Sequence, residues 1–321
     1  MGIYKSSIPY FGYKVIILLK KILSLYSANY QSNMDISKES DQWDIVIKPK
    51  EKGFHLNLGE IWRYRDLLYM YVHREFVATY KQTILGPLWF FIQPIFTTLI
   101  FMLVFSGIAG ISTDGLPPIL FYMSGTVLWN YFNECFTKTS GTFLINATVF
   151  SKVYFPRLVV PLSALVANML KLGIQLLLFF SFYIYFYFDG YNIGMNLYML
   201  LFPLLVFMIA GISFGVGIIV SSITIKYRDL NILITFAIGL LMYITPVIYP
   251  LSAIPERYKA FSLIIQLNPL SSVIETFRFA VLGTGTFSWA SLTYSFIFTI
   301  VIMLVGISTF NKVERKFVDI V

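Results

Sequence analysis

Charged residues are scarce in this 321-residue chain: Asp, Glu, Lys and Arg make up 12% of it, whereas 57% of its residues are hydrophobic. One globule of this size cannot bury that much apolar surface, so membrane lipids must cover part of it. The net charge of +8 is not gathered into a basic stripe with stacking aromatic residues, which argues against a nucleic-acid partner. These features predict an integral membrane protein.

Residues that bind metals or form covalent intermediates are also few. The single cysteine, Cys135, excludes an intrachain disulfide, and it lies in an apolar run, where we expect a small core residue. The two histidines, His55 and His73, are not part of an H-E-x-x-H motif, and no D-x-D pair is present to hold a metal. The sequence therefore predicts neither a catalytic residue nor a metal site, and we expect that the chain is not an enzyme.

The chain also lacks a nucleotide-binding loop. The motif G-x-x-x-x-G-K-[ST] does not occur, and no glycine is followed directly by lysine. Without this loop the chain cannot hold nucleotide phosphates in the usual P-loop manner. We expect no cofactor on this chain, so any ATP and Mg²⁺ must be bound by another chain.

Long apolar runs, in contrast, are abundant. A helix needs roughly 20 apolar residues to cross about 30 Å of hydrocarbon. Six stretches meet this length: 88–108, 117–136, 163–186, 197–223, 230–250 and 289–310. We predict an all-α membrane protein with six transmembrane helices.

Two shorter apolar pieces lie between the fifth and sixth stretches. Residues 260–267 and 270–282 are separated by Asn268-Pro269, and neither piece is long enough to cross a membrane. They predict a re-entrant helical hairpin over residues 251–282, before the last transmembrane helix.

The distribution of basic residues predicts the orientation. Twenty of the 24 Lys and Arg residues fall on one side of the six stretches, and 12 of these lie within residues 1–88. The opposite side has only Arg257, Lys259 and Arg278, all in the hairpin region. The positive-inside rule then places both termini in the cytoplasm, as in a multi-pass protein of the inner membrane.

Residues 61–82 interleave apolar residues with basic ones at helical spacing, which predicts an amphipathic helix lying along the inner membrane surface. The basic residues of this interface helix are Arg63, Arg65, Arg74 and Lys81. We divide the chain into a cytoplasmic N-terminal extension (1–60), the interface helix (61–87) and a transmembrane domain (88–321).

Two charges fall near or within the predicted transmembrane helices. Glu134 is four residues before Lys138, and an i,i+4 pair between them would explain it. Lys171 lies about 8 residues, or roughly 12 Å, inside the third stretch. It either snorkels to the inner surface or pairs across helices with Glu134, and the sequence leaves both interpretations open.

A series of short motifs carries a family resemblance over about residues 60–321. In chain order the motifs are Arg65-Asp66-Leu67, Tyr80-Lys81-Gln82-Thr83, Leu85-Gly86-Pro87-Leu88-Trp89, Pro94, Lys152-Val153-Tyr154-Phe155-Pro156-Arg157-Leu158, Pro161, Tyr227-Arg228-Asp229, Pro246-Val247-Ile248-Tyr249-Pro250, Ile254-Pro255 and Asn268-Pro269. Together with the predicted helices, their order resembles the permease subunit of ABC-2 type exporters, and within that family the Wzm-like subunits that export O-antigen and related polysaccharides.

The resemblance implies a homodimer that works with a separate nucleotide-binding ATPase subunit and moves a lipid-linked glycan from the cytoplasm to the outer face. An exporter of teichoic acid, capsule or a small drug-like molecule is an alternative with the same architecture. A membrane-embedded glycan enzyme is a second alternative, although the two loops outside the hairpin are too short for its catalytic residues. A scaffold, the remaining alternative, would not bind an ATPase.

A segment that couples to a cytoplasmic ATPase must be short, rigid and on the inner side. Residues 146–161 meet these demands, because Pro156 and Pro161 limit flexure and Lys152 and Arg157 are expected to face water. A loop whose basic residues only set topology is the alternative. The candidate coupling residues are Phe150, Lys152, Val153, Tyr154, Phe155, Pro156, Arg157, Tyr227, Arg228 and Asp229. Arg228 and Asp229 can equally serve as caps of the neighbouring helices.

Two further groups of candidates concern the transport path. Prolines at the entry and middle of the hairpin predict that it moves as a unit and gates the external exit; the gate residues are Pro246, Tyr249, Pro250, Pro255, Asn268 and Pro269. Aromatic rings can stack on the CH-rich faces of sugars, and the resemblance places five of them near the dimer axis. These channel candidates are Phe90, Phe91, Phe96, Phe101 and Tyr243, with packing inside the bundle as the alternative.

Overall fold

The computed structural model describes residues 58–320 except 82, 192, 228 and 255–258. The predicted extension, residues 1–60, therefore lies almost wholly outside the described residues, as do Arg228 and Pro255. The helices are α2 (Leu58–Arg63), α3 (Arg65–Tyr80), η1 (Gly86–Leu88), α4 (Trp89–Phe101), η2 (Met102–Ile108), α5 (Pro118–Ser140), α6 (Thr142–Ile145), α7 (Ala147–Phe150), α8 (Val159–Phe188), η3 (Leu197–Leu201), α9 (Phe202–Thr224), α10 (Leu230–Ile244), η4 (Leu251–Ala253), α11 (Lys259–Leu267), α12 (Pro269–Leu282) and α13 (Trp289–Ile320). The described part of the chain contains no strand, so the all-α prediction is confirmed there.

Among the described residues, four helical segments are long and apolar enough to cross a membrane, and they coincide with four of the six predicted stretches. They are Gly86–Ile108, Val159–Phe188, Leu197–Thr224 and Trp289–Glu314. Helix α5 has 23 residues but carries Asn133, Glu134 and Lys138, and α10 has only 15 residues. Six crossings therefore stay a prediction, as does the re-entrant course of the hairpin.

Helix α10 ends at Ile244 and not at residue 250 as the apolar run predicts. Thr245 is extended (φ −90°, ψ 137°) because Pro246 disfavours helical geometry in the residue before it and has no N–H to donate. The residues up to Pro250 form a loop, and this loop leaves backbone carbonyls available for other partners.

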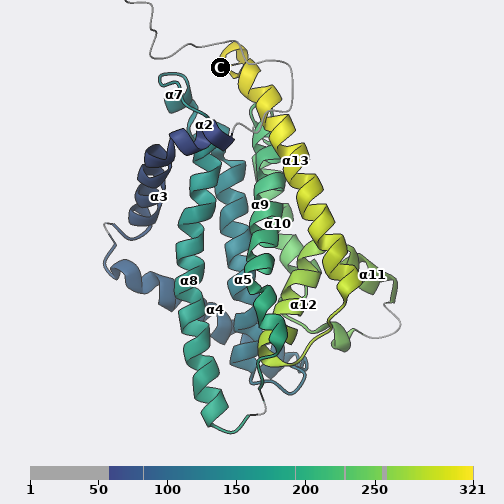
Figure 1. Cartoon of the computed structure of the whole chain (residues 1–321). Helices are drawn as coiled ribbons and strands as arrows, with labels where there is room; N and C mark the ends of the chain where they lie inside the picture. Colours follow the sequence, from purple (N-terminus) through teal and green to yellow (C-terminus); the bar gives the residue numbers. More distant parts are fainter. Residues whose placement is uncertain (1–57, 82, 192, 228, 255–258, 321) are drawn as a thin grey trace, which may run out of the picture. The chain divides into compact units, whose positions relative to one another are not determined.

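Helix α9 is the central element of the bundle, with α5 on one side and α13 on the other (Figure 1). Glycines permit its close approach to α13: a Cβ on Gly215 would lie 2.7 Å from the carbonyl oxygen of Ile302, and one on Gly306 would lie 2.6 Å from the oxygen of Gly215. The Gly211-x-x-x-Gly215 pattern thus marks a tight helix–helix contact.

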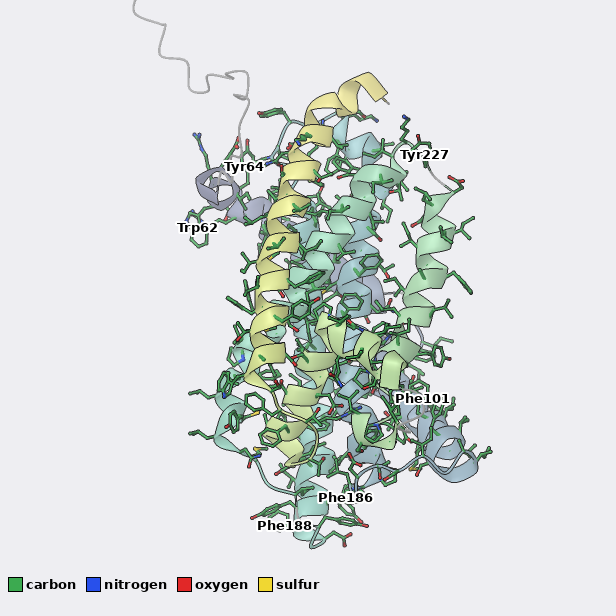
Figure 2. The ribbon with its side chains drawn as sticks, turned by 90° about the vertical axis from the view of Figure 1, so that its right-hand side faces the viewer. Trp62, Tyr64, Phe101, Phe186, Phe188 and Tyr227 are labelled. Carbon is green, nitrogen blue, oxygen red and sulfur yellow. The ribbon has the colours of Figure 1, made fainter. Side chains whose placement is uncertain are left out.

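The segments predicted on the inner side gather at one end of the bundle. Helices α2 and α7 and the C-terminal end of α13 lie together at the top of Figure 1. Trp62, Tyr64 and Tyr227 lie at this same end in Figure 2, whereas Phe186 and Phe188 lie at the opposite end. Segments predicted to lie on one side thus share one end of the bundle. We label that end the inner end and the opposite one the outer end, after the predicted orientation, which stays a prediction.

Candidate functional site

The candidate coupling segment at the inner end is anchored by an aromatic cluster. Phe150 and Phe155 are buried, and their rings lie 5.8 Å apart. Tyr71 of α3 lies 6.2 Å from Phe155, and Phe143 of α6 lies 5.9 Å from Phe150 and 4.5 Å from Phe310 of α13. These contacts tie the segment to α3, α6 and α13, so it is held as part of the bundle.

Arg157 is partly buried, so it faces water less fully than Lys152, which is exposed. Its Nη1 donates a hydrogen bond of 2.8 Å to the carbonyl oxygen of Glu314 in α13, and its guanidinium lies 5.5 Å from the ring of Phe150. The buried aromatic residues draw the loop inward, which brings Arg157 within reach of α13. Arg157 is therefore a residue that holds the loop.

The exposed tip of the same segment consists of Lys152, Val153 and Tyr154. Val153 is 57% exposed and Tyr154 is 64% exposed, although both are hydrophobic. The tip thus presents a small apolar surface beside a positive charge. A rigid base with an exposed apolar tip is the arrangement expected of a docking element.

The other candidates at the inner end are Tyr227, Asp229 and the basic residues of the predicted interface helix. Tyr227 is exposed, with the Lys226 ammonium 5.2 Å from its ring centre. Asp229 stands at the N-cap position of α10, where its charge suits the helix dipole, although its side chain makes no capping hydrogen bond. All four basic residues of the predicted interface helix are exposed: Arg63, Arg65, Arg74 and Lys81. A course along the membrane surface stays a prediction.

Helix α3 is joined to α5 by an ion pair that the sequence analysis missed. Lys138 Nζ lies 2.9 Å from Glu75 Oε2, so the expected i,i+4 pair of Lys138 with Glu134 is wrong. Burial raises the pKa of Glu75, but the hydrogen bonds and charges of Lys138 and Arg74 together outweigh burial, and the pKa is lowered below its usual value. Glu75 and Lys138 are 63 residues apart in the sequence, so this ion pair cannot be predicted without the tertiary structure.

Lys171 pairs across helices and does not snorkel. Its Nζ donates to Glu134 Oε2 at 2.7 Å, and the residue is 9% exposed. Of the two interpretations left open by the sequence, the pairing between α8 and α5 is confirmed. Once Glu134 is committed to Lys171, Lys138 is free to reach Glu75.

The hairpin is divided into α11 and α12 by the break predicted at Asn268-Pro269. Asn268 caps α12, because its Oδ1 accepts from the Leu270 N–H at 3.1 Å. Its Nδ2 donates to Thr245 Oγ1 at 2.8 Å, which joins the hairpin to the loop after α10. In that loop the Tyr249 hydroxyl donates to the carbonyl of Tyr243 at 3.0 Å.

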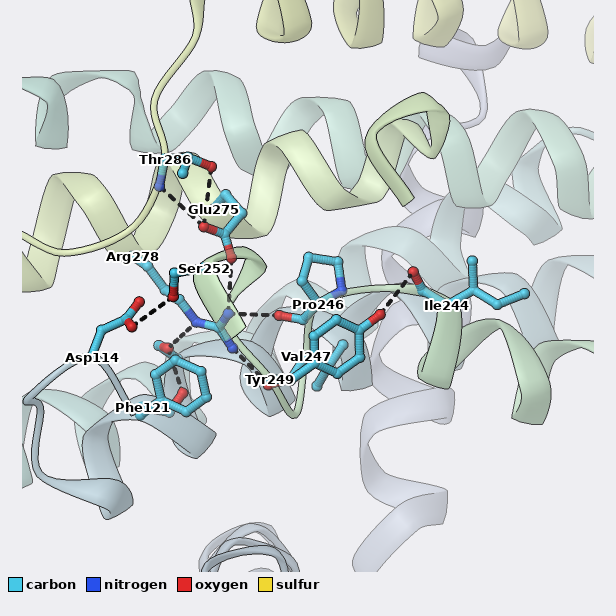
Figure 3. Close-up of polar contacts among 11 residues, drawn as sticks. Asp114, Phe121, Ile244, Pro246, Val247, Tyr249, Ser252, Glu275, Arg278 and Thr286 are labelled. Atoms are coloured by element: carbon cyan, nitrogen blue, oxygen red, sulfur yellow. Dashed lines mark hydrogen bonds and ion pairs between the residues drawn. The ribbon is translucent and has the colours of Figure 1, made fainter. Parts of the chain in front are cut away.

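Arg278 of α12, which the sequence analysis assigned only to the outer-side charges, is buried at 1% exposure. Its Nη1 and Nη2 each donate at 2.6 Å, to the carbonyls of Pro246 and Val247 respectively, and its Nε donates to Ser124 Oγ at 3.2 Å (Figure 3). Its guanidinium carbon also lies 4.1 Å from the ring centre of Phe121. One side chain thus joins α12, α5 and the loop after α10.

Glu275 balances this charge one helical turn away. Its Oε1 accepts from Arg278 Nη1 at 3.1 Å, and its Oε2 accepts from the N–H of Thr286 at 3.1 Å. A Cβ on Gly125 would lie 2.8 Å from Arg278 Nη2 and 2.6 Å from the carbonyl oxygen of Val247, so only glycine fits there. The Glu-x-x-Arg spacing inside an apolar helix is the sequence signal that could have revealed this pair.

The channel candidates are not equivalent. Phe90 is buried and stacks on Phe76 of α3 with ring centres 5.6 Å apart, and Phe101 packs edge-on against Tyr122 at 6.4 Å. The other three candidates are exposed on this chain: Phe91, Phe96 and Tyr243. A channel role for any of the five stays a prediction, and for Phe90 it would require α3 to move.

We expect Arg278→Met to lower the free energy of unfolding by about 3–5 kcal/mol, because it leaves the Glu275 carboxylate buried without its cation. Adding Glu275→Gln should cost less in this variant than in the wild-type chain. The control is Arg74→Met, which removes an exposed partner of Glu75 and should cost about 0–1 kcal/mol. Unfolding is followed in mixed detergent micelles, and equal costs for Arg278→Met and Arg74→Met would contradict the role given to Arg278.

Known proteins resemble this chain over most of its length. The family model for the ABC-2 type transporter matches residues 66–282. A protein named O-antigen export system permease protein RfbA, from Klebsiella pneumoniae, is 30% identical over 82% of this chain and 97% of its own length. Its namesake from Myxococcus xanthus is 28% identical over 68% of this chain and 81% of its own length. The polysialic acid transport protein KpsM of Escherichia coli is 24% identical over 75% of this chain and 91% of its own length.

The family match covers more than half of the chain, and the 30% identical relative is matched over almost its whole length. The matched region begins in α3 and ends with the last residue of α12, so it contains both the exposed tip at Lys152–Tyr154 and the hairpin of α11 and α12. The chain belongs to the ABC-2 type transporter family.

Proposed function

We propose that this chain is the permease subunit of an ABC transporter that exports a lipid-linked polysaccharide of the O-antigen type across the inner membrane. ATP, with Mg²⁺, is hydrolysed on a separate subunit. The observation that carries this proposal is the similarity to O-antigen export permeases along nearly their full length. The family relation and the helical bundle support a subunit that forms the membrane pathway.

The test of the cargo is deletion of the gene in its native cell, followed by localisation of lipid-linked glycans. If the chain exports a polysaccharide, glycan should accumulate on the cytoplasmic side of the inner membrane and be lost from the cell surface. Re-expression of the intact chain should restore the surface glycan. A normal surface glycan after deletion would contradict the proposal and favour an ABC-2 exporter with a smaller substrate.

In this proposal the inner end contacts the ATPase, and both termini are cytoplasmic. The exposed tip at Lys152, Val153 and Tyr154 is the docking element, and the aromatic cluster below it transmits force to α3, α6 and α13. A rigid connection is required because a flexible loop would absorb the movement of the motor. Tyr227, exposed at the same end, is a second contact.

We further propose that two copies of the chain form the transporter. Helix α10 has no buried residue in one copy and exposes Ile232, Leu233 and Phe236. Helix α4, which like α10 contacts α5, also exposes Phe96 and Ile100. Either lipid or a second copy can cover these apolar faces, and a homodimer would bring them to a shared axis.

The external gate in this proposal is centred on α11, whereas the sequence pattern predicts that the whole hairpin moves as a unit. Helix α12 is buried and held by Arg278, whereas α11 exposes Leu263, Ile264 and Leu267. Opening the exit by moving α11 alone therefore breaks fewer contacts than moving α11 and α12 together.

We expect the double variant Val153→Ala/Tyr154→Ala to reduce co-purification of the ATPase subunit at least several-fold while the chain stays folded. Tyr154 and Val153 are exposed, so their loss removes docking surface without disturbing the core. The matched control is Tyr187→Ala, an exposed tyrosine near the outer end of α8. Arg157→Ala is a poor probe because that side chain holds the loop. Unchanged complex yield in the double variant would refute docking at this tip.

A further inference from the structure

Two ion pairs join α5 to its neighbours from one face of that helix. Helices α3 and α5 both pack against α8, as Figure 1 shows. Lys138 of α5 lies 2.9 Å from Glu75 of α3, and Glu134 of α5 lies 2.7 Å from Lys171 of α8. Glu134 and Lys138 are four residues apart, so they are neighbours on the helix surface, with Cβ atoms about 5–6 Å apart. The lysine of one pair is therefore within reach of the carboxylate of the other.

Both Glu134 and Lys138 have bonding capacity that these pairs do not use. Glu134 accepts from Lys171 through Oε2, and no residue in the described part of the chain donates to its Oε1. The Lys138 ammonium has three N–H groups and gives one of them to Glu75. The side chain of Lys138 is 47% exposed and that of Glu134 is 36% exposed, so neither is packed into one position. Rotation of the Lys138 side chain would bring it to Glu134.

Such a rotation leaves each charge with a partner. Lys171 is buried, and it keeps Glu134 whether or not Lys138 also binds there. Glu75 has a second cation nearby, because Arg74 Nη2 lies 3.5 Å from its Oε1. The two arrangements therefore avoid the large cost of an unpaired buried charge, and they can lie close in free energy.

Helix α3 is the element through which the candidate coupling segment reaches this pair. The ring of Tyr71 lies 6.2 Å from that of Phe155 in the segment, and the Arg74 guanidinium lies 4.4 Å from the Tyr71 ring centre. Tyr71, Arg74 and Glu75 are spaced i, i+3 and i+4, which places them on one face of α3. Displacement of the segment therefore moves the face of α3 that carries Glu75.

We propose that Lys138 is a positioning residue of the transport cycle, which exchanges between Glu75 of α3 and Glu134 of its own helix. While Glu75 lies beside α5, Lys138 binds it. When the coupling segment draws α3 away, Lys138 binds Glu134 and shares that carboxylate with Lys171. Sharing brings two positive charges together and weakens the contact between α5 and α8, so movement at the inner end reaches the bundle. This role in transport rests on the proposed function, whereas the exchange is a property of the chain alone.

The first test measures the reactivity of the Lys138 amine in the purified full chain. An N-hydroxysuccinimide ester acetylates accessible lysines, and mass spectrometry follows the rate at each of them. Glu75→Gln should leave the rate at Lys138 nearly unchanged, because Glu134 replaces the lost partner. Adding Glu134→Gln should then raise it several-fold. The exposed Lys152 is the internal control for reagent access. A several-fold rise at Lys138 in Glu75→Gln alone would overturn the exchange.

A double-mutant cycle tests the exchange without chemical labelling. Glu75 and Lys171 belong to different ion pairs, so Glu75→Gln and Lys171→Met should have additive effects if the pairs are independent. If Lys138 exchanges, it pairs with Glu134 in the double variant. The double variant should then lower the thermal unfolding midpoint by at least about 2 °C less than the sum of the single variants. The effects should become additive in a Lys138→Met background. Additivity in the wild-type background would contradict the exchange.

The role in transport is tested in the reconstituted permease–ATPase complex. Lys138→Met should raise the number of ATP molecules hydrolysed per glycan exported several-fold, and co-purification of the ATPase should stay unchanged. Lys138→Arg should restore the ratio, because arginine can pair with either carboxylate. The matched control is Lys312→Met, which removes an exposed lysine of α13. A residue that only stabilises the fold would lower the yield of complex without changing this ratio, and an unchanged ratio would overturn the positioning role.

This inference and the proposed function fail separately. Labelling and the unfolding cycle use the chain alone, so they report the exchange whatever the cargo is. Absence of exchange in a chain whose deletion strands glycan in the cytoplasm would remove this inference alone. A normal surface glycan after deletion would remove polysaccharide export, and the exchange would stand on the labelling and unfolding results.

Discussion

A guanidinium inside an apolar bundle is tolerated only when its N–H groups find acceptors and its charge finds a partner. Arg278 satisfies both demands with two backbone carbonyls, one serine and one carboxylate drawn from three separate parts of the chain. The carbonyls are available because α10 ends at Ile244, before Pro246. The early end of one helix, the glycine at position 125 and the burial of α12 are therefore parts of a single arrangement.

This arrangement divides the outer hairpin into two halves with different freedom. Helix α12 shares the core of α5 and α9, whereas α11 has an exposed apolar face. At the inner end, a single loop combines a buried aromatic base with an exposed tip. If the proposed export function is correct, the buried base is where force from the ATPase would enter, and the exposed α11 is the element that would move as cargo leaves.

Much of the fold follows from local patterns in the sequence. Long apolar runs identify the four long apolar helices, and Asn268-Pro269 marks the break between α11 and α12 because proline and the residue before it interrupt a helix. The apolar run at 230–250 did not reveal where α10 ends, since hydrophobicity continues past Pro246 into the loop.

The contacts that define the candidate sites depend on partners far apart in sequence, and the sequence patterns did not determine them. Counting positive charges treats Arg278 and Arg157 as topology signals. Arg278 bonds to a carbonyl 31 residues away and Arg157 to one 157 residues away, and the sequence alone does not distinguish such a buried or bonded arginine from an arginine in a loop. The sequence left two positions open for the Lys171 side chain, at the inner surface or paired with Glu134. The packing of α8 on α5 decides between them, because it brings Glu134 Oε2 within 2.7 Å of Lys171 Nζ.

The most direct test of the account is hydrogen–deuterium exchange of the reconstituted permease–ATPase complex, compared at rest and during ATP turnover. If α12 is fixed by Arg278 and α11 is the moving element, the amides of α12 should exchange as slowly as those of α5 in both states. Exchange in α11 should rise during turnover. A parallel rise in α11 and α12 would contradict the account, because it would show that the hairpin moves as one body.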